Sequence, residues 1–312
     1  MRDAFGREIN YLRVSVTERC NLNCVYCGKE ECAKRDSELT PGQIEKIVRA
    51  AAACGVTKVR LTGGEPLVRD DICEIAGRIR GIEGIKTLSL TTNGVYLQKY
   101  AAALKAAGLD SVNVSLDSAD GSTYRHLTGA DVLHKVLDGI DAARAAGLSP
   151  IKINAVLMKG VNADGAGALI DLARATPLDV RFIELMPFSD PGEDARLRVT
   201  GDALLRRFPF LTPTGQTEGT AVYYTAEGFS GRVGLISPVS KKFCAACNRV
   251  RLLSTGEIRP CLGHEAVYDL KPFLDDEEKL LSAVREAILA KPAGHDFTRA
   301  NGELHAMNKI GG

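Results

Sequence analysis

Strand-like and helix-like runs alternate over the first two thirds of this 312-residue sequence, and this alternation restricts the fold more than any other feature. Strands that alternate with helices form parallel sheets joined by right-handed crossovers. The strand-like runs are residues 12–16, 58–62, 87–92, 111–117, 151–158 and 180–185. Six such units are too few for a closed eightfold barrel, which takes about 250 residues. The pattern therefore predicts an α/β fold, either a partial (β/α)6 TIM-type barrel with an open side or a doubly wound sheet.

Short segments suited to a functional site end or follow four of these strands, and three of them are polar or glycine-rich. The four segments are Gly63–Pro66, Thr91–Asn93, Ser115–Asp117 and Met186–Pro187. Active sites of β/α barrels gather at the C-terminal ends of their strands. The position of these segments favours the partial barrel and predicts a functional site at that end.

The stretch "TPGQIEKIVRAAAACG" has the strongest helix pattern in the chain. Thr40 and Gln43 have the spacing of a capping box, and Pro41 suits the first turn. Gly55 suits a left-handed C-cap. We expect a helix between Thr40 and Gly55.

The pattern changes after roughly residue 190, where a polar, Gly/Pro-bearing connection begins. Two hairpins are expected beyond it, one from residues 221–226 and 232–237 and one turning at Ser254–Gly256. A helix is expected near residues 275–290. The predicted domains are therefore a barrel at residues 1–190 and a smaller C-terminal α+β domain at residues 191–312.

Charge and hydrophobicity are ordinary for a globular protein. The formal net charge is +1, so no global field attracts nucleic acid or anionic lipid. The first residues lack the apolar core of a signal peptide, and no run approaches 18 apolar residues. We expect a cytoplasmic protein with neither a membrane nor a nucleic-acid partner. In it, metal binding or redox activity is favoured over a disulfide framework for the nine cysteines, and Cys32, Cys54 and Cys73, which lie outside the two triads, are expected to be ordinary small residues.

Three cysteines lie within eight positions as Cys20-x3-Cys24-x2-Cys27. A cube of four irons normally takes four cysteine ligands. With three, one iron keeps an open position, just as catalytic zinc sites keep one. The spacing predicts a metal site that leaves room for an external ligand. The alternative is a zinc site with a distant fourth ligand.

A second triad, Cys244-x2-Cys247-x13-Cys261, lies in the C-terminal third. With His264 it has the spacing of a Cys3His zinc site. Spacing alone leaves zinc and an open iron cluster as equal alternatives here.

The first triad, directly after a strand and with Tyr26 before its last cysteine, resembles that of the radical SAM superfamily. "GGEP" at residues 63–66 matches the superfamily's second motif, whose glycines let backbone approach a ligand. Further matches narrow the resemblance to the GTP 3′,8-cyclase (MoaA) family of molybdenum-cofactor biosynthesis. They are "FGREINYLRVSVTERCNLNCVYC", "LTTNG", "VNVSLD", "VRFIELM", "FCAACNRVRL" and "MNKIGG".

The resemblance implies two [4Fe-4S] clusters, each on one triad, with S-adenosylmethionine on the first and GTP on the second. It implies contacts to S-adenosylmethionine from Tyr26, Gly64, Ser115 and Met186. It implies contacts to GTP from Arg13, Arg60, Thr91, Lys152, Arg181, Arg249, Val250 and Arg251. Arg13 matches an arginine needed for catalysis, and the tail residues Gly311 and Gly312 enter the active site. Two departures are Gly28-Lys29 in place of Met-Pro and the unassigned His264.

The strand positions of the basic residues support a triphosphate site independently of the resemblance. Arg13, Arg60 and Lys152 lie on different strands where core residues are expected, and Arg181 lies on another. Such residues are rarely buried without a partner. In a barrel they project inward together, and guanidinium groups bind phosphate oxygens bidentately.

The implied reaction begins when an external one-electron reductant reduces the first cluster. S-adenosylmethionine is then cleaved to methionine and a 5′-deoxyadenosyl radical, which takes hydrogen from C3′ of GTP so that the ribose closes onto C8. The implied partners are the downstream cyclic pyranopterin monophosphate synthase and a second copy of the chain in a homodimer. The rival interpretations are a radical SAM peptide maturase and a non-catalytic zinc-binding or nucleic-acid-binding protein.

Overall fold

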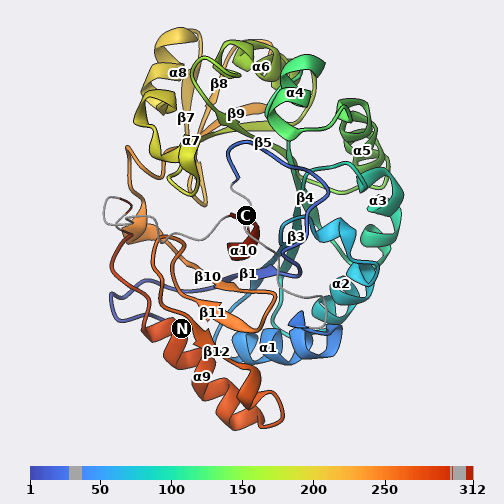
Figure 1. The fold of residues 1–312 in the computed structure, drawn as a ribbon, viewed down its shortest axis with the longest axis vertical. Helices are drawn as coiled ribbons and strands as arrows, with labels where there is room; N and C mark the ends of the chain where they lie inside the picture. Colours follow the sequence, from blue (N-terminus) through green and yellow to red (C-terminus); the bar gives the residue numbers. More distant parts are fainter. Residues whose placement is uncertain (28–36, 296, 298–306, 312) are drawn as a thin grey trace.

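A twelve-stranded sheet forms the centre of the fold in the computed structural model, which describes residues 1–27, 37–295, 297 and 307–311. Six of its strands are those expected from the sequence, and neighbours among them pair in parallel. These strands curve around a central space with helices outside (Figure 1). The α/β class and the partial barrel are therefore confirmed. The six strands are β1 (Tyr11–Ser15), β2 (Lys58–Thr62), β3 (Thr87–Thr92), β4 (Ser111–Ser115), β5 (Ile151–Leu157) and β6 (Asp179–Glu184).

Strands from the C-terminal third extend this array at both edges. β10 (Arg249–Leu252) pairs in parallel with β1, and β9 (Arg232–Ile236) pairs in parallel with β6. Both expected hairpins are confirmed, since β8 is antiparallel to β9 and β11 is antiparallel to β10. Sequence patterns predicted the two hairpins. They did not predict that one hairpin would pair with β1 and the other with β6. The outer strands are β7 (Thr212–Glu218), β8 (Ala221–Thr225), β11 (Glu257–Arg259) and β12 (Tyr268–Asp269).

Helices cover the outer face of the curved sheet (Figure 1). Those between the barrel strands are α1 (Pro41–Ala53), α2 (Ile72–Arg80), α3 (Leu97–Ala106), α4 (Gly121–Thr128), α5 (Leu133–Ala145) and α6 (Ala166–Ala175). The later helices of the chain are α7 (Asp190–Glu193), α8 (Gly201–Arg207), α9 (Glu277–Leu289) and α10 (Met307–Ile310), of which α10 does not belong to this outer layer. Strand residues such as Leu12, Val14 and Leu61 are fully buried against this helical layer. None of the helices in the described ranges is both long and apolar enough to cross a membrane.

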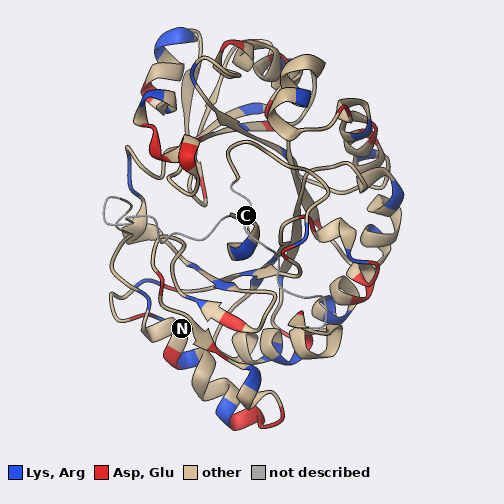
Figure 2. Cartoon of the chain, in the orientation of Figure 1, with Lys and Arg blue, Asp and Glu red and all other residues tan. Residues whose placement is uncertain are grey.

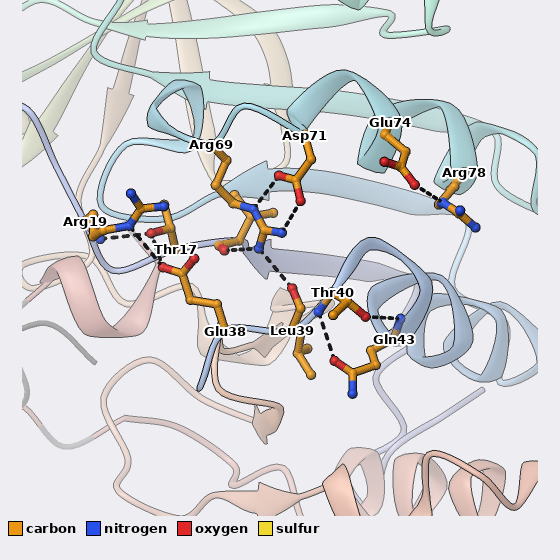
Figure 3. Close-up of polar contacts among 11 residues, drawn as sticks. Thr17, Arg19, Glu38, Leu39, Thr40, Gln43, Arg69, Asp71, Glu74 and Arg78 are labelled. Carbon is orange, nitrogen blue, oxygen red and sulfur yellow. Dashed lines mark hydrogen bonds and ion pairs between the residues drawn. The ribbon is translucent and has the colours of Figure 1, made fainter. Parts of the chain in front are cut away.

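The start of α1 has the predicted capping box (Figure 3). The Gln43 backbone N–H donates to Thr40 Oγ1 at 3.3 Å, and the Thr40 N–H donates to Gln43 Oε1 at 2.9 Å. Two otherwise orphaned backbone donors are thereby satisfied. Gly55 follows the helix with φ of +92°, as expected for its left-handed end.

Arg69 joins the end of β1 to the start of α1 (Figure 3). Its Nη1 donates to Val16 O at 2.8 Å and to Leu39 O at 3.0 Å, while Asp71 accepts from Nε and Nη2. A buried guanidinium with all these acceptors satisfied holds the connection rigidly. The segment held in this way leads directly to Cys20.

The C-terminal helix α10 lies in the centre of the barrel ring rather than on its surface (Figure 1). Met307 N donates to Cys27 O at 3.1 Å, and Ile310 is buried. The tail therefore packs against the same strand ends that carry the first triad.

Candidate active site

One cavity of about 740 Å³ occupies the space enclosed by the strands. All six predicted ligands line it, although the two triads lie more than 200 residues apart in the sequence. Other lining residues predicted from the resemblance are Arg13, Tyr26, Arg60, Gly64, Thr91, Ser115, Lys152, Arg181, Met186, Arg249 and Arg251. The barrel thus brings the predicted ligand, cofactor and substrate positions into one site.

The cavity is strongly basic although the chain is nearly neutral. Nine Lys and Arg residues line it against four Asp and Glu, counted over the described residues. Basic residues are visible on the inner strands β10 and β1 in Figure 2. Enclosed low-dielectric walls strengthen such a local field, which favours an anionic ligand.

The first triad lies on the loop after β1. Burial raises the pKa of Cys24, and negative charge on Asp117, Cys27 and Cys20 raises it further. Across the described ranges, no group of three Cys, His, Asp or Glu side chains lies close enough to hold a single metal ion. The assignment of these cysteines as ligands therefore rests on their spacing, on the shared cavity and on the family.

The GGEP segment packs directly against the loop that carries the first triad. Gly64 N donates to Thr17 O and Glu65 N donates to Arg19 O, each at 2.8 Å. A Cβ on Gly64 would lie 2.5 Å from Arg19 O. The sequence argument explained this glycine by the close approach of a ligand. The structure shows that the backbone at Arg19 also comes too close for any side chain at this position.

Glu65 links this segment to the end of β3. Its carboxylate accepts from Leu67 N, Thr92 Oγ1 and Asn93 N at 3.0, 2.7 and 2.6 Å. Burial raises its pKa to about 7, against the lowering effect of these hydrogen bonds. The motif therefore joins β2 to β3 through a buried carboxyl group.

Tyr26 contacts a carboxylate that the sequence argument did not assign to the site. Its hydroxyl donates to Asp117 Oδ2 at 2.6 Å, and Val156 N donates to Asp117 Oδ1 at 2.8 Å. Burial raises the pKa of Asp117 to about 6. Asp117 follows Ser115 by two residues, so the spacing at the end of the strand could have identified it.

The second triad lies before β10 and after β11, with Cys244 in a short 3-10 turn. Burial raises the pKa of Cys247, but the charges of Arg249 and Lys291 outweigh this effect and lower it to about 7. His264 is exposed and lies outside the cavity lining, and its carbonyl accepts from Arg259 Nε at 2.7 Å. The structure therefore gives no support for a Cys3His site that includes His264.

Three arginines form a row across adjacent strands. Arg251 on β10 is in register with Arg13 on β1, which is in register with Arg60 on β2. Neighbouring strands are only about 4.8 Å apart, so these like charges repel unless an anion lies between them. The buried Nε atoms of Arg249 and Arg251 make no hydrogen bond to the described residues. Such buried donors require an acceptor, and a phosphate or nucleobase supplies one.

Strand alternation explains the different place of Val250. Side chains alternate between the two faces of a strand, so Arg249 and Arg251 face the cavity while Val250 points into the hydrophobic core. Val250 lies outside the cavity lining, and its contact to GTP stays a prediction.

Two further basic residues of the predicted GTP site, Lys152 and Arg181, lie on β5 and β6. Arg181 Nε donates to Asn154 Oδ1 at 2.9 Å, and Lys152 forms an ion pair with Glu218 at the tip of the β7–β8 hairpin. Arg60 Nη1 donates to Thr91 Oγ1 at 3.4 Å. Asn154 and Glu218 were not predicted, although Asn154 shares a strand face with Lys152.

The tail reaches the arginine row. Arg13 Nη2 donates to Gly311 O at 3.3 Å. A Cβ on Gly311 would lie 2.9 Å from Ser15 Cβ and Thr62 Oγ1, and its φ is +75°. Glycine is therefore required there both by space and by conformation. Gly312, Gly28 and Lys29, which also figured in the sequence predictions, lie outside the described residues.

Comparison with known proteins agrees with this geometry. Residues 14–173 match the radical SAM superfamily, and residues 178–297 match the Molybdenum Cofactor Synthesis C family. A GTP 3′,8-cyclase of Alkaliphilus oremlandii is 43% identical over 100% of both chains, and one of Geobacter sulfurreducens is 44% identical over 99% of both. This chain belongs to the GTP 3′,8-cyclase family. The sequence-based family assignment is therefore confirmed.

The solved structures bear on the fold of this family member. Streptococcus suis SuiB bound to S-adenosylmethionine matches 89% of this chain and 64% of its own, with a TM-score of 0.60 and 15% identity. At that identity the likeness shows a shared fold only. It therefore carries no information on the reaction that this chain catalyses.

Proposed function

We propose that this chain is a radical SAM GTP 3′,8-cyclase. It converts GTP and S-adenosylmethionine to 3′,8-cyclo-7,8-dihydro-GTP, 5′-deoxyadenosine and methionine, the first step of molybdopterin biosynthesis. The observation that carries the proposal is a single basic cavity with a cysteine triad at each of two positions on its wall. Full-length relatives named GTP 3′,8-cyclase support it.

The number and type of the cysteine side chains match the ligands of two [4Fe-4S] clusters. Cys20, Cys24 and Cys27 would hold the first, and Cys244, Cys247 and Cys261 would hold the second. Three thiolates leave one iron of each cluster open to a small molecule. The first cluster supplies, when reduced, the electron that cleaves the sulfonium of S-adenosylmethionine.

The residues around the first triad suit a cationic cofactor. S-adenosylmethionine carries a sulfonium and an ammonium group, and Glu65, Asp117 and Glu18 line this part of the cavity. Ser115, Met186 and the backbone at Gly64 would complete its binding site, with Tyr26 held in place by Asp117. These groups orient the cofactor and do not themselves react.

The basic residues would bind and orient GTP. Arg13, Arg60 and Arg251 offer a row of guanidinium donors to the triphosphate, and Lys152 and Arg181 extend it across the cavity. Arg249 precedes this row beside the second triad, where the guanine would bind. Fixing both ends of the nucleotide holds C3′ and C8 close together, which removes much of the entropic barrier to ring closure.

The tail would close the site from within. Gly311 contacts Arg13, and α10 packs against the backbone of Cys27. A tail in this position excludes water from the reactive ribose. We assign Arg13 and Gly311 to catalysis on this basis, and we assign Gly312, which lies outside the described residues, from the family resemblance.

We also propose three properties that follow from family membership: an external one-electron donor, a cyclic pyranopterin monophosphate synthase that takes the product, and a homodimer. The barrel at residues 1–190 and the cluster-bearing domain at residues 191–312 remain our proposed division.

Anaerobic reconstitution tests the proposed function. The chain is loaded with iron and sulfide, reduced, and supplied with S-adenosylmethionine and GTP. We expect 5′-deoxyadenosine and the cyclised nucleotide in equal amounts by mass spectrometry, and none of the cyclised product with ATP. Formation of 5′-deoxyadenosine that is indifferent to GTP contradicts the proposal, as does a redox-silent metal at either triad.

A further inference from the structure

Two buried cations lie beside the second triad and have no part in the mechanism above. Arg7 belongs to the N-terminal segment before β1, and Lys291 follows the end of α9. They are 9% and 2% exposed and both line the cavity. Long cationic side chains are rarely buried unless their charge and donors are used.

Arg7 fastens the first cysteine of the triad to the segment after α9. Its Nη1 donates to Cys244 O at 3.0 Å and to Ala293 O at 2.9 Å. Its Nη2 donates to Pro292 O at 2.6 Å. Gly294 follows Ala293, and a Cβ added to it would lie 3.5 Å from Cys244 Sγ. One guanidinium therefore holds both the backbone of Cys244 and the wall against its sulfur.

Lys291 does the same for the other two cysteines. Its Nζ donates to Arg249 O and to Pro260 O, each at 2.8 Å. Arg249 comes two residues after Cys247, and Pro260 immediately precedes Cys261. A single ammonium thus joins two ligand-bearing segments that are otherwise connected through the β10–β11 hairpin.

The two cations differ in how their charge is balanced. Asp3 forms an ion pair with Arg7 at 2.6 Å, and the Asp3 side chain is fully buried. Lys291 has no carboxylate partner among the residues that the structure describes. Burial lowers its pKa, and the negative charges of Cys247 and Cys261 oppose that effect. Burying an ammonium without a carboxylate is costly, so the two carbonyl hydrogen bonds that Lys291 donates beside the triad must offset that cost.

We propose that Arg7 and Lys291 are positioning residues for the second triad. Arg7 sets the place of Cys244, and Lys291 sets those of Cys247 and Cys261 while keeping a positive charge beside their thiolates. This inference rests on the proposed function in one respect, namely that the second triad holds a cluster. It also explains why the N-terminal segment packs against a site formed by the last third of the chain.

The test uses the full-length chain with Cys20, Cys24 and Cys27 replaced by Ala, so that only the second cluster is assembled. This triple-Ala chain is the parent for all comparisons. We measure how much iron it retains in the presence of a chelator, the spectrum of its reduced cluster, and the midpoint potential of that cluster. Lys291→Met and the charge-neutral pair Asp3→Asn with Arg7→Met are then compared with the parent. Lys279→Met on the exposed face of α9 is the matched control.

We expect Lys291→Met to lose iron about tenfold faster, as is usual when an outer partner of a metal ligand is removed. Its midpoint potential falls, because the reduced and more negative cluster loses a nearby positive charge. The Asp3/Arg7 double variant loses iron faster with little change of potential. Lys291→Arg keeps the potential of the parent and shows intermediate iron loss. Lys279→Met behaves as the parent does.

Parent-like iron retention and an unchanged potential in Lys291→Met overturn the proposal. If that variant does not fold, Lys291→Arg decides, because retention equal to the parent then contradicts the positioning role. A parent that takes up no iron, while a chain lacking only the second triad does, refutes the second cluster itself. That outcome ends both proposals and is distinct from a failure of the positioning role alone.

Discussion

The two cysteine triads share one cavity but lie in opposite electrostatic surroundings. Around the first, buried carboxyl groups dominate, and burial raises the pKa values of Glu65 and Asp117 to about 7 and about 6. Around the second, cations dominate, and Arg249 and Lys291 lower the pKa of Cys247 to about 7 despite its burial. The same ligand type is thus set in an acidic half and a basic half of one site.

This difference shows how one cavity can sort two substrates. A sulfonium cofactor is favoured where carboxylates gather, and a triphosphate is favoured where arginines do. Cluster chemistry alone would not distinguish the two ends, because each of the two proposed clusters would leave one iron open. We infer that the surrounding charges, rather than the ligands, decide which molecule binds where.

Removing each triad in turn should have the largest effect. Replacing Cys20, Cys24 and Cys27 by Ala should abolish 5′-deoxyadenosine formation, because no electron reaches the cofactor. Replacing Cys244, Cys247 and Cys261 should leave slow cleavage of S-adenosylmethionine but abolish cyclisation. Liquid chromatography of both products checks this, with iron per chain halved in each variant as the control. Equal loss of cleavage in both would mean that the two ends are not separate in role.

The buried carboxyl group of Asp117 should make the free energy of unfolding depend on pH. Its folded pKa is raised from 3.8 to about 6, so the folded state holds its proton more tightly than the unfolded state. Its contribution to stability is therefore present below pH 4 and lost as pH rises through 6. Two pKa units correspond to about 3 kcal/mol. Urea unfolding of the metal-free Asp117→Asn variant and of the unaltered chain is measured between pH 4 and 7. As pH rises, the free energy of unfolding of the variant should exceed that of the unaltered chain by a growing amount. Parallel pH profiles would contradict the prediction.

Arg251→Ala should weaken GTP binding by about 10- to 100-fold, the effect of losing a charge-assisted hydrogen bond. Binding of S-adenosylmethionine should not change, because that ligand belongs to the acidic half. Calorimetry on the reconstituted protein measures both affinities. Arg78→Ala, on the exposed surface of α2, is the control and should affect neither. An equal loss for both ligands would remove the electrostatic distinction between the halves.

The smallest effect is expected in thiol reactivity. In metal-free protein at pH 7 about half of Cys247 is thiolate, since its pKa is about 7, while burial keeps Cys24 protonated. Cys247 should react with iodoacetamide at least about tenfold faster than Cys24, measured by peptide mass spectrometry. Arg249→Ala should slow the reaction of Cys247 with iodoacetamide at that pH, because Arg249 has the largest lowering effect on the pKa of this thiol. Similar rates at both cysteines would argue against the comparison.

Local patterns predicted much of this molecule. The capping box at Thr40 and Gln43, the six barrel strands and both hairpins follow from side-chain periodicity and turn residues, which act over a few positions. The convergence of Arg13, Arg60 and Lys152 also followed, because residues on the inner face of barrel strands project into one space. Asp117, Asn154 and Glu218 were not predicted as site residues, since polar residues at strand ends and turns are common without any function.

By itself the sequence determined the ligand spacing and the order of β/α units, because both depend on covalent geometry or near neighbours. Only the tertiary structure decided that β10 pairs with β1, so that Arg251 lies beside Arg13. It alone placed Arg7 and Lys291 against the second triad. The physical reason is that register and long-range contacts are set by the packing of the whole sheet. No local pattern encodes which distant backbone carbonyl a buried cation will reach.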